Sequence, residues 1–373
     1  MEKKTIFSEE VEIPDIVEKR IADTLCQIQT EGKTMRKQKK IWQNKAAVAA
    51  CVCVVAAGTV TAGAAVHYHW GRGTQGAIQA DDTQQQNLTA QGVAEVYNAK
   101  EDYESLAVTE SGITVKPDTV ITDGNMVYLS FLVEGYPIAE DAEPGFESVD
   151  VYLDGEDENA LNMDGGFYDG IVSNENAEPV YEDGSELAYT DDGNLISHYV
   201  DEDGNLEYVI RAFSSEIGDS LLGKKLHVDF TNMGTVEKAD YAEGVAGSWN
   251  FILTLPDQKA SEEITLDSRI ADSVFTVDSV ELSPVSIEIH YSVNGEVETS
   301  GDENGVPAFC GVVLKDGTRL PYLGDGGMSS YTDESRTAAY VISAFDRVIE
   351  PDEVQALLLR VTPGAEFVTV ELP

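Results

Sequence analysis

The stretch that decides the fold is residues 112–133, GITVKPDTVITDGNMVYLSFLV. Its second half, residues 126–133, is a nearly continuous run of apolar and β-favouring residues, which predicts a core strand. Asp123-Gly124-Asn125 stands just before that run, and Gly and Asn tolerate the positive φ angles of a hairpin turn. Residues 112–116 and 119–122 therefore predict strand before the turn, and the stretch predicts a β-rich fold.

Short strand patterns continue from this stretch to the C-terminus, and the polar run 256–261 separates them into two groups. Region 154–204 is acidic and rich in Gly and Asn, which predicts long loops or irregular hairpins. In the second group Ile287, Ile289 and Tyr291 alternate with polar residues and so share one face. The other expected strands are 149–153, 206–211, 226–230 and 249–255 in the first group, and 264–266, 274–277, 308–314, 337–342, 356–361 and 367–372 in the second. This spacing predicts a sandwich of about 115 residues for the second group.

Charge divides the 373 residues into three pieces. The whole chain has 24 Lys and Arg against 68 Asp and Glu, a formal net charge of −44. Residues 1–45 carry a net +2, residues 46–66 carry no charge, and residues 67–373 carry −46. So acidic a surface repels phosphate backbones, and no nucleic-acid partner is expected. Because 42% of the residues are hydrophobic, disorder throughout the chain is also excluded.

The uncharged piece, AAVAACVCVVAAGTVTAGAAV at 46–66, predicts a transmembrane helix. Its 21 residues would span about 30 Å as a helix, the thickness of a bilayer core. Basic residues lie on its N-terminal side and aromatic residues on both sides, as the positive-inside rule and the aromatic belt require. These membrane-flanking residues are Arg36, Lys37, Lys39, Lys40, Trp42 and Lys45 before the span and Tyr68 and Trp70 after it. The lipid bilayer is thus an expected partner, with the N-terminus cytoplasmic and everything after the span outside the cell.

Two other interpretations of residues 46–66 stay open. A buried Ala/Val helix in a soluble protein is one, although the neighbouring cations and the acidic C-terminal part speak against it. A cleaved signal peptide is the other, because Ala62-Gly63-Ala64 fits a small-residue cleavage pattern. The 45 residues that precede the span are far more than the n-region of a signal peptide normally holds. A retained anchor is therefore favoured.

The N-terminal piece predicts one amphipathic helix followed by a basic stem. Val17, Ile21, Leu25 and Ile28 recur at helical spacing and form a single apolar stripe. A lone helix with one such stripe cannot build a core of its own. The stripe therefore binds a partner, lies on the inner membrane surface, or stays partly disordered, and the first is favoured.

The expected fold class is mainly β, with a cytoplasmic helix and a transmembrane helix ahead of two extracytoplasmic β-sandwich, Ig-like domains. The stretch after Trp70 is rich in Gln, Gly, Thr and Asp without apolar periodicity, which predicts a flexible polar spacer. The expected divisions are a cytoplasmic part at 1–45, the membrane span at 46–66, the linker at 67–96, the first β-domain at 97–256 and the second at 257–373.

Catalytic and metal-binding motifs are not found in the sequence. It contains no G-x-S-x-G, H-E-x-x-H or P-loop pattern, and an enzyme is not expected. Cys310 is the only Cys after residue 66, so no disulfide within the outer domains is expected, and its apolar neighbours predict a small buried side chain. His227 and His290 fall in expected strands and predict hydrogen-bonded structural residues. No cofactor is expected, and structural zinc is not supported.

Two acidic loops superficially resemble calcium loops, at 190–194 and 201–205. Neither has the D-x-D-x-D-G spacing followed by Glu at the twelfth position. Asp-Gly-Asn is also the composition of a tight hairpin turn, which is the favoured interpretation. Weak binding of a divalent cation outside the cell stays open.

Several of these patterns resemble an uncharacterised family of Gram-positive single-pass membrane proteins. The resemblance lies in GITV at 112–115 with DGNMVYLSF at 123–131, and in the turn and core patterns ITLD at 264–267, FTVDSVELSP at 275–284 and LKDG at 314–317. The N-terminal Ile13-Pro14-Asp15 through Thr24-Leu25 is similar to the short cytoplasmic start of these proteins. The resemblance implies a domain of unknown function followed by an Ig-like domain. Members are often encoded beside extracytoplasmic-function sigma factors, which implies an anti-sigma role.

The function that these observations predict is a membrane-anchored, anti-sigma-type regulator. Its cytoplasmic stripe would bind a sigma factor, although the N-terminal piece lacks the His/Cys zinc motif of one large anti-sigma class. Its ectodomain would sense an envelope signal or gate cleavage by a site-specific membrane protease. The alternative is an envelope adhesion or scaffold protein with a non-catalytic ectodomain.

Overall fold

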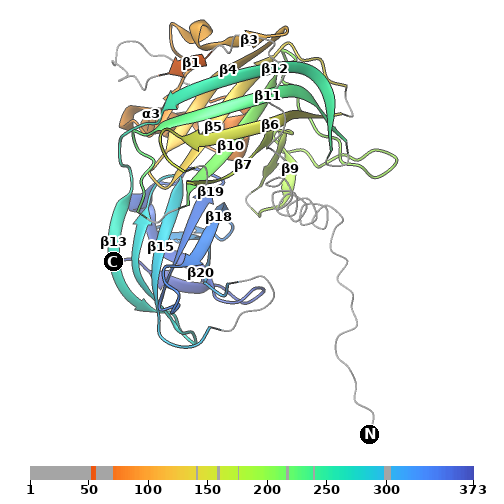
Figure 1. Cartoon of the computed structure of the whole chain (residues 1–373). Helices are drawn as coiled ribbons and strands as arrows, with labels where there is room; N and C mark the ends of the chain where they lie inside the picture. The colour runs from red at the N-terminus through yellow and green to blue at the C-terminus, as the bar shows by residue number, and fades with distance from the viewer. Residues whose placement is uncertain are drawn as a thin grey trace. The chain divides into compact units, whose positions relative to one another are not determined.

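The computed structural model describes residues 52–55, 70–139, 142–157, 160–174, 176–215, 218–237, 240–297 and 304–373. Contacts group Ala50–Glu237 and Tyr241–Pro373 into one compact unit. The described residues are mainly β, as expected, and Figure 1 shows the strands running through most of the traced chain. The cytoplasmic stripe and all of the membrane-flanking residues except Trp70 lie outside the described residues.

The first group of strands forms two sheets. One has the order β1-β12-β11-β6 and the other the order β2-β4-β5-β10-β7, with β3 paired to β4. The bounds are β1 Val52–Val55, β2 Ala94–Val96, β3 Val108–Glu110, β4 Ile113–Thr122, β5 Met126–Glu134, β6 Glu143–Leu153, β7 Leu161–Phe167, β10 Leu206–Ser214, β11 Lys225–Glu237 and β12 Asp240–Thr254. A 3-10 turn, η1 Tyr103–Leu106, precedes β3, and β8 Ile171–Ser173 pairs with β9 Pro179–Tyr181.

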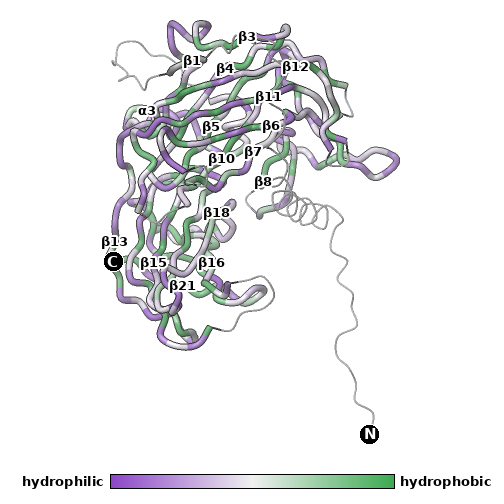
Figure 2. Tube along the Cα trace, viewed as in Figure 1, coloured by the Kyte–Doolittle hydropathy of each residue, from purple (hydrophilic) through white to green (hydrophobic). Residues whose placement is uncertain are grey.

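The two sheets pack face to face over one apolar core. Period-two alternation supplies the inward side chains from β4, β5 and β10 on one side and from β6, β11 and β12 on the other. At its centre the ring of Phe131 lies 4.9 Å from that of Phe230 and 5.1 Å from that of Phe251. Figure 2 shows apolar segments recurring along these strands. The prediction of a core strand after the Asp-Gly-Asn turn is confirmed.

The β4–β5 hairpin closes as its sequence predicts. Thr122 pairs with Val127 across the turn, and Gly124 adopts a φ of +111°. The Asp123 carboxylate accepts hydrogen bonds from the backbone N–H groups of Asn125 and Met126. A side chain that bonds its own turn in this way replaces the ladder bonds lost at the end of the strands.

The second group of strands forms another pair of sheets with its own core. Their orders are β13-β14-β15-β19-β18 and β17-β16-β20-β21. The bounds are β13 Glu262–Arg269, β14 Phe275–Leu282, β15 Ser286–Val293, β16 Ala308–Leu314, β17 Arg319–Leu320, β18 Gly324–Tyr331, β19 Ala338–Phe345, η2 Pro351–Glu353, β20 Val354–Arg360 and β21 Val368–Glu371. Ile287, Ile289 and Tyr291 are buried together in this core, which confirms the alternation expected for β15.

The prediction of a flexible spacer at 67–96 is wrong for the residues that the structure describes. The chain after Trp70 forms α2 Arg72–Ala77, α3 Asp82–Gln91 and β2. Asp81 caps α3 through a capping box with Gln84, and Gly92 ends the helix at a φ of +74°. The few apolar residues of the segment are buried in a third core with residues of both sandwiches. The sequence of this segment shows no helical periodicity, because these short helices are stabilised by tertiary contacts rather than by an amphipathic stripe.

Trp70 is also placed differently from its predicted position at a membrane interface. Its side chain is 6% exposed and lies in the third core, together with Ile78 and Leu88. An amphipathic ring fits a membrane interface and a protein core equally well, so its sequence position alone could not decide between them.

Little of the predicted transmembrane helix lies within the described residues. Of residues 46–66 the structure describes Val52–Val55, and these are extended rather than helical, paired in parallel with β12 from Asn250 to Leu253. A run with three Val among four residues has high β-propensity, and the edge of β12 offers it ladder partners. None of the helices formed by the described residues has the length and apolar character needed to cross a bilayer.

Candidate functional site

Two buried carboxylates lie on the outer face of the β2-β4-β5-β10-β7 sheet. In β10 the residues Leu206, Tyr208 and Ile210 face the core, so Glu207 points outward. Glu207 is nevertheless only 6% exposed, and Asp118 of β4 is 5% exposed. A carboxylate hidden from water is costly unless hydrogen-bond donors replace the solvent. The cover of this face must therefore supply donors.

The cover is residues 70–80, which we call the docked segment. The N–H of Gly71 donates to Asp118 Oδ2 over 3.0 Å. The next two N–H groups, of Arg72 and Gly73, donate to the two oxygens of Glu207 over 2.8 and 2.6 Å. Three consecutive backbone amides at the start of α2, which have no partner within the helix, are thus bound by two carboxylates.

Glycines allow the docked segment to approach the sheet so closely. A Cβ on Gly73 would lie 2.8 Å from Cγ2 of Val209. A Cβ on Gly76 would lie 2.1 Å from the ring of Tyr168. The three glycines of the GRGTQG run therefore serve close packing of a helix on a sheet, and none of them has a positive φ.

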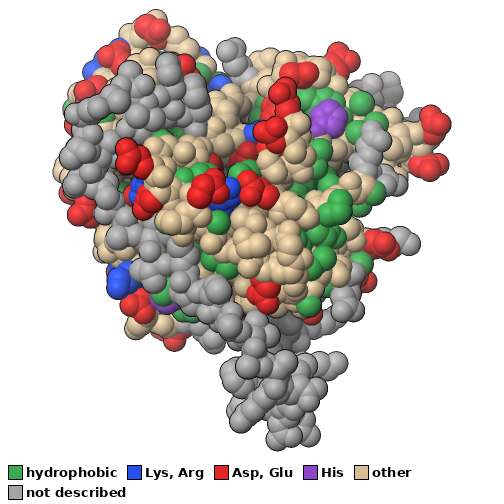
Figure 3. Space-filling view, turned by 90° about the horizontal axis from the view of Figure 1, so that it is seen from above, with side chains coloured by type: hydrophobic (Ala, Val, Ile, Leu, Met, Phe, Trp, Pro, Cys, Tyr) green, Lys and Arg blue, Asp and Glu red, His purple; other side chains and the backbone are tan. Residues whose placement is uncertain are grey.

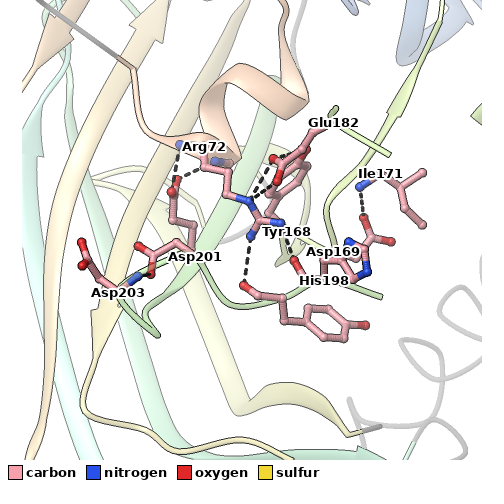
Figure 4. A network of polar contacts seen from close by, with 11 residues as sticks. Arg72, Tyr168, Asp169, Ile171, Glu182, His198, Asp201 and Asp203 are labelled. Carbon is pink, nitrogen blue, oxygen red and sulfur yellow. Dashed lines mark hydrogen bonds and ion pairs between the residues drawn. The ribbon is translucent and has the colours of Figure 1, made fainter. Parts of the chain in front are cut away.

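The side chain of Arg72 extends the attachment to the irregular region after β7 (Figure 4). Its Nε lies 2.7 and 2.9 Å from the two oxygens of Glu182, and its terminal nitrogens donate to the carbonyls of His198 and Tyr199. The guanidinium also lies 4.9 Å from the centre of the Tyr168 ring, and the Tyr168 hydroxyl donates to Glu182. We call Asp118, Glu182 and Glu207 together the carboxylate clamp.

Arg72 is a conspicuous cation in its surroundings. Residues 117–210 contain no Lys or Arg, so the clamp draws its cation from the docked segment. Figure 3 shows acidic side chains spread over one face of the molecule, with few basic ones among them. A guanidinium that meets a carboxylate, two carbonyls and a ring face has the geometry that proteins use to bind arginine specifically.

The far end of the docked segment attaches to the second sandwich. The N–H of Gln79 donates to the carbonyl of Asp346 over 2.8 Å, and the N–H of Val348 donates to the carbonyl of Gln79 over the same distance. The Gln79 side chain also donates to the carbonyl of Ser173. Ile78 is fully buried in the third core. One short segment therefore contacts both sandwiches.

Burial changes the electrostatics of the clamp. Desolvation, reinforced by the neighbouring Asp118, raises the pKa of Glu207 to about 7, although the Gly73 and Arg72 amides and the Arg72 charge lower it. Desolvation likewise raises the pKa of Asp118 against the hydrogen bonds donated by Thr119, Asn98 and Gly71. The pKa of the nearby Tyr103 is raised by burial and by Asp118. The two carboxylates thus disfavour each other's charge.

The two acidic loops are hairpin turns, as favoured from their composition. Gly193 and Gly204 have φ angles of +82° and +83°. Backbone bonds close each turn, from Thr190 to Asn194 and from Asp201 to Asn205. Among the described residues no group of three or more His, Cys, Asp and Glu side chains has an arrangement that could hold a metal ion.

Of the three histidines within the described residues, His227 and His290 lie in strands, as Cys310 does, and His198 lies in a loop. His290 Nε2 lies 2.8 Å from Glu288 in β15, so His290 is hydrogen-bonded within its strand, as expected. His227 stacks on Tyr152 and lies 3.4 Å from Asp154. Cys310 is half-buried rather than fully buried. His198 accepts a hydrogen bond from Arg72 through its backbone carbonyl and stacks on Tyr181.

Sequence reasoning missed the carboxylate clamp. Among 68 acidic residues, Asp118 and Glu207 do not stand out. One available signal was the Gly71-Arg72-Gly73 step, a lone cation between closely spaced glycines in a region without other basic residues. A second was Glu207 within an otherwise apolar strand pattern.

A scan of the sequence against protein-family models finds no match, and a search of curated proteins finds none either. Among solved structures, the chain is similar to a conserved domain protein from Bacillus anthracis, with 16% identity, a TM-score of 0.41, and coverage of 72% of this chain and 83% of that one. It is also aligned with the CupB6 tip adhesin from Pseudomonas aeruginosa, with 10% identity, a TM-score of 0.14, and coverage of 67% and 85%. Likenesses this distant assign neither a family nor a function.

Proposed function

We propose that the chain is a membrane-anchored regulator of the anti-sigma type, with a cytoplasmic N-terminus and an acidic, non-catalytic ectodomain. The observation that supports it is the docked segment. On this proposal the chain leaves the bilayer after residue 66 and is bound by the folded ectodomain from residue 70 onward. A change in the ectodomain can then act on the membrane span through only a few intervening residues.

A clamped attachment differs from what a simple stalk requires. A flexible Gly- and Gln-rich tether would display an adhesive domain without any ordered contacts. Ordering the docked segment costs conformational entropy, and burying Asp118 and Glu207 costs desolvation. An ordered attachment with these costs can transmit a change in the ectodomain to the preceding chain, whereas a flexible tether cannot. The docked segment therefore favours the regulator over the adhesion protein.

The membrane span belongs to the same proposal. Residues 46–66 would form a helix in the bilayer, where a helix satisfies all of its own backbone groups. Residues 52–55 would then exchange the edge of β12 for the membrane. The basic residues from Arg36 to Lys45 would fix the cytoplasmic side.

The cytoplasmic partner is proposed to be a sigma factor bound by the stripe Val17, Ile21, Leu25 and Ile28. Its support is the apolar stripe that the sequence predicts, together with the resemblance to membrane proteins encoded beside sigma factors. A helix with apolar anchors at this spacing typically binds in a groove of its partner. A site-specific membrane protease acting near the span would be a further partner.

Affinity purification of the full-length chain from its native cells tests the partner. We expect a sigma factor to copurify with the wild type, and Val17→Asp with Ile21→Asp to reduce its recovery at least tenfold. The matched control places two Asp residues on the polar face, through Lys19→Asp and Gln27→Asp, and should retain the partner.

Failure to recover a sigma factor, or equal recovery with the stripe variant, would overturn this assignment. If deleting residues 1–32 leaves the cellular phenotype of the protein intact, the adhesion or scaffold function is favoured instead. Labelling of intact cells with a membrane-impermeant maleimide checks the topology separately: the variant Tyr189→Cys, at an exposed position, should react, and Cys26 should not.

A further inference from the structure

Asp118 and Glu207, the two carboxylates beneath the docked segment, are neighbouring titratable groups. They bind three consecutive amides, of Gly71, Arg72 and Gly73, and both are almost completely hidden from water. Asp118 is further bonded by Asn98 Nδ2 over 2.8 Å and by Thr119 Oγ1 over 2.9 Å. Removal of the docked segment would take away both the amide donors and the cover, and it would return the carboxylates to solvent.

The charged and titratable groups around Glu207 come from β4, α2, η1 and the loop after β9. Asp118 of β4 raises its pKa, and Arg72 of α2 lowers it. Tyr103 of η1 interacts electrostatically with both carboxylates. Glu182, after β9, acts through Arg72, whose side chain it binds. Among these groups, therefore, Arg72 is the one cation, and it is partly solvated, whereas the acids Asp118 and Glu207 are buried.

We propose that docking of residues 70–80 is a proton-linked latch, in which Glu207, next to Asp118, takes up a proton when the segment docks and releases it when the segment leaves. This inference rests on the proposed function, because it assigns protonation of Glu207 as the event that regulates the attachment between the ectodomain and the membrane span. No covalent chemistry is involved, and the proton comes from solvent.

The direction of the pH dependence follows from the two states of Glu207. When the segment is docked, burial holds its pKa at about 7, and when the segment is released, exposure to water returns the pKa toward the ordinary Glu value of about 4.3. The docked state therefore binds more protons between these values. Docking is strongest below the lower value and weakens by about tenfold per pH unit as the pH rises toward 7. Acid closes the latch, and neutral pH loosens it.

Hydrogen exchange of the full-length chain in detergent, at pH 5, 6, 7 and 8, tests the latch. The measured quantity is the protection factor of peptides covering residues 70–77. Because a protection factor is the ratio of intrinsic to observed exchange rate, it is corrected for the intrinsic pH dependence of exchange. In the wild type we expect protection to fall by about tenfold per unit between pH 5 and 7 and then to level off. A peptide from β15 serves as a reference for global unfolding.

Glu207→Gln should give lower protection with no fall between pH 5 and 7, because the amide does not titrate. Asp118→Asn, which removes the neighbouring charge, should shift the fall to lower pH. Glu366→Gln, at an exposed position, is the matched control and should behave as the wild type. Glu207→Gln cannot be used if it also lowers the protection of the β15 peptide, because the whole fold is then destabilised. In that case the pH at which protection falls in Asp118→Asn tests the latch.

Protection that is high and independent of pH in the wild type would overturn the latch and leave the rigid attachment standing. An unchanged slope in Glu207→Gln would overturn it as well. Absence of protection at every pH would show that residues 70–77 are not docked in solution. The observation that supports the proposed function would then be lost.

Discussion

Buried carboxylates take part in two of the attachments that the first sandwich makes to its neighbours. Asp118 and Glu207 hold the docked segment, whereas Asp123 holds the second sandwich. Asp123 accepts the hydroxyl hydrogen bonds of Ser283 and Ser286, besides the two amides of its own turn. It is 2% exposed, and desolvation raises its pKa, as it does for the other two.

The difference lies in the neighbours of the acid. The pKa of Asp123 is shifted by burial and by hydrogen bonds, whereas the pKa of Glu207 is also shifted by a second carboxylate. The burial of Asp123 is offset only in part, by its hydrogen-bond donors. Asp118 and Glu207 are adjacent, so they also compete for the ionised state. The same residue type thus forms a joint with a single acid at one end and with a coupled pair of acids at the other.

The largest effect should come from breaking the joint at Asp123. Asp123→Ala leaves two hydroxyls and two turn amides without their acceptor, which costs about 3 kcal/mol of unfolding free energy. Asp123→Asn keeps one acceptor oxygen and should cost about 1 kcal/mol. Chemical denaturation of both variants measures the difference. Equal and small losses would show that the joint contributes little.

The docked segment can be displaced by a single methyl group. Gly76→Ala places a Cβ in the Tyr168 ring and should destabilise by about 2 kcal/mol, with loss of hydrogen-exchange protection at residues 70–77. Gly166→Ala in β7 is the matched control, because a Cβ there meets nothing within 4 Å. We expect the control to change stability by less than about 0.5 kcal/mol. Similar losses in both would contradict the close packing of α2.

The Arg72 ion pair should contribute less, because Glu182 is partly solvated. Arg72→Ala should cost about 1 kcal/mol, and Arg72→Lys should restore only part of it, since an ammonium cannot bind both oxygens of Glu182 and the two carbonyls together. Thermal unfolding at low and high salt measures the loss. Full recovery in Arg72→Lys would show that charge alone, rather than guanidinium geometry, matters.

The smallest effect concerns a further buried carboxylate, Glu288, which lies outside both attachments. Its hydrogen bond raises the pKa of His290, against desolvation. A raised folded-state pKa means that this stabilisation is present below the ordinary His pKa and is lost as the pH rises through the raised value. The contribution should be below about 1 kcal/mol and disappear in Glu288→Gln. Unfolding curves at pH 6 and 9 provide the check: Glu288→Gln should lose stability at pH 6 and little at pH 9, and an equal or larger loss at pH 9 would contradict this ion pair.

Strands with strong patterns were predictable from sequence, and strands with weak ones were not. β5 and β15 are runs of apolar or alternating residues, and both formed as expected. β7, with the sequence LNMDGGF, and β18, with GDGGMSSY, carry no such pattern. They are strands because β10 and β19 offer them free edges to pair with.

The sequence by itself determined the β-rich character, the Asp123 hairpin turn and the separation of two apolar cores, since these depend on local turn chemistry and on period-two alternation. The tertiary structure alone decided that residues 70–80 are docked and that Asp118 and Glu207 are hidden beneath them. Asp118 and Glu207 are 89 residues apart in sequence and are joined by backbone amides, which every residue except proline carries. A backbone N–H does not encode which acid it will meet, so only the folded chain reveals that these amides bind Asp118 and Glu207.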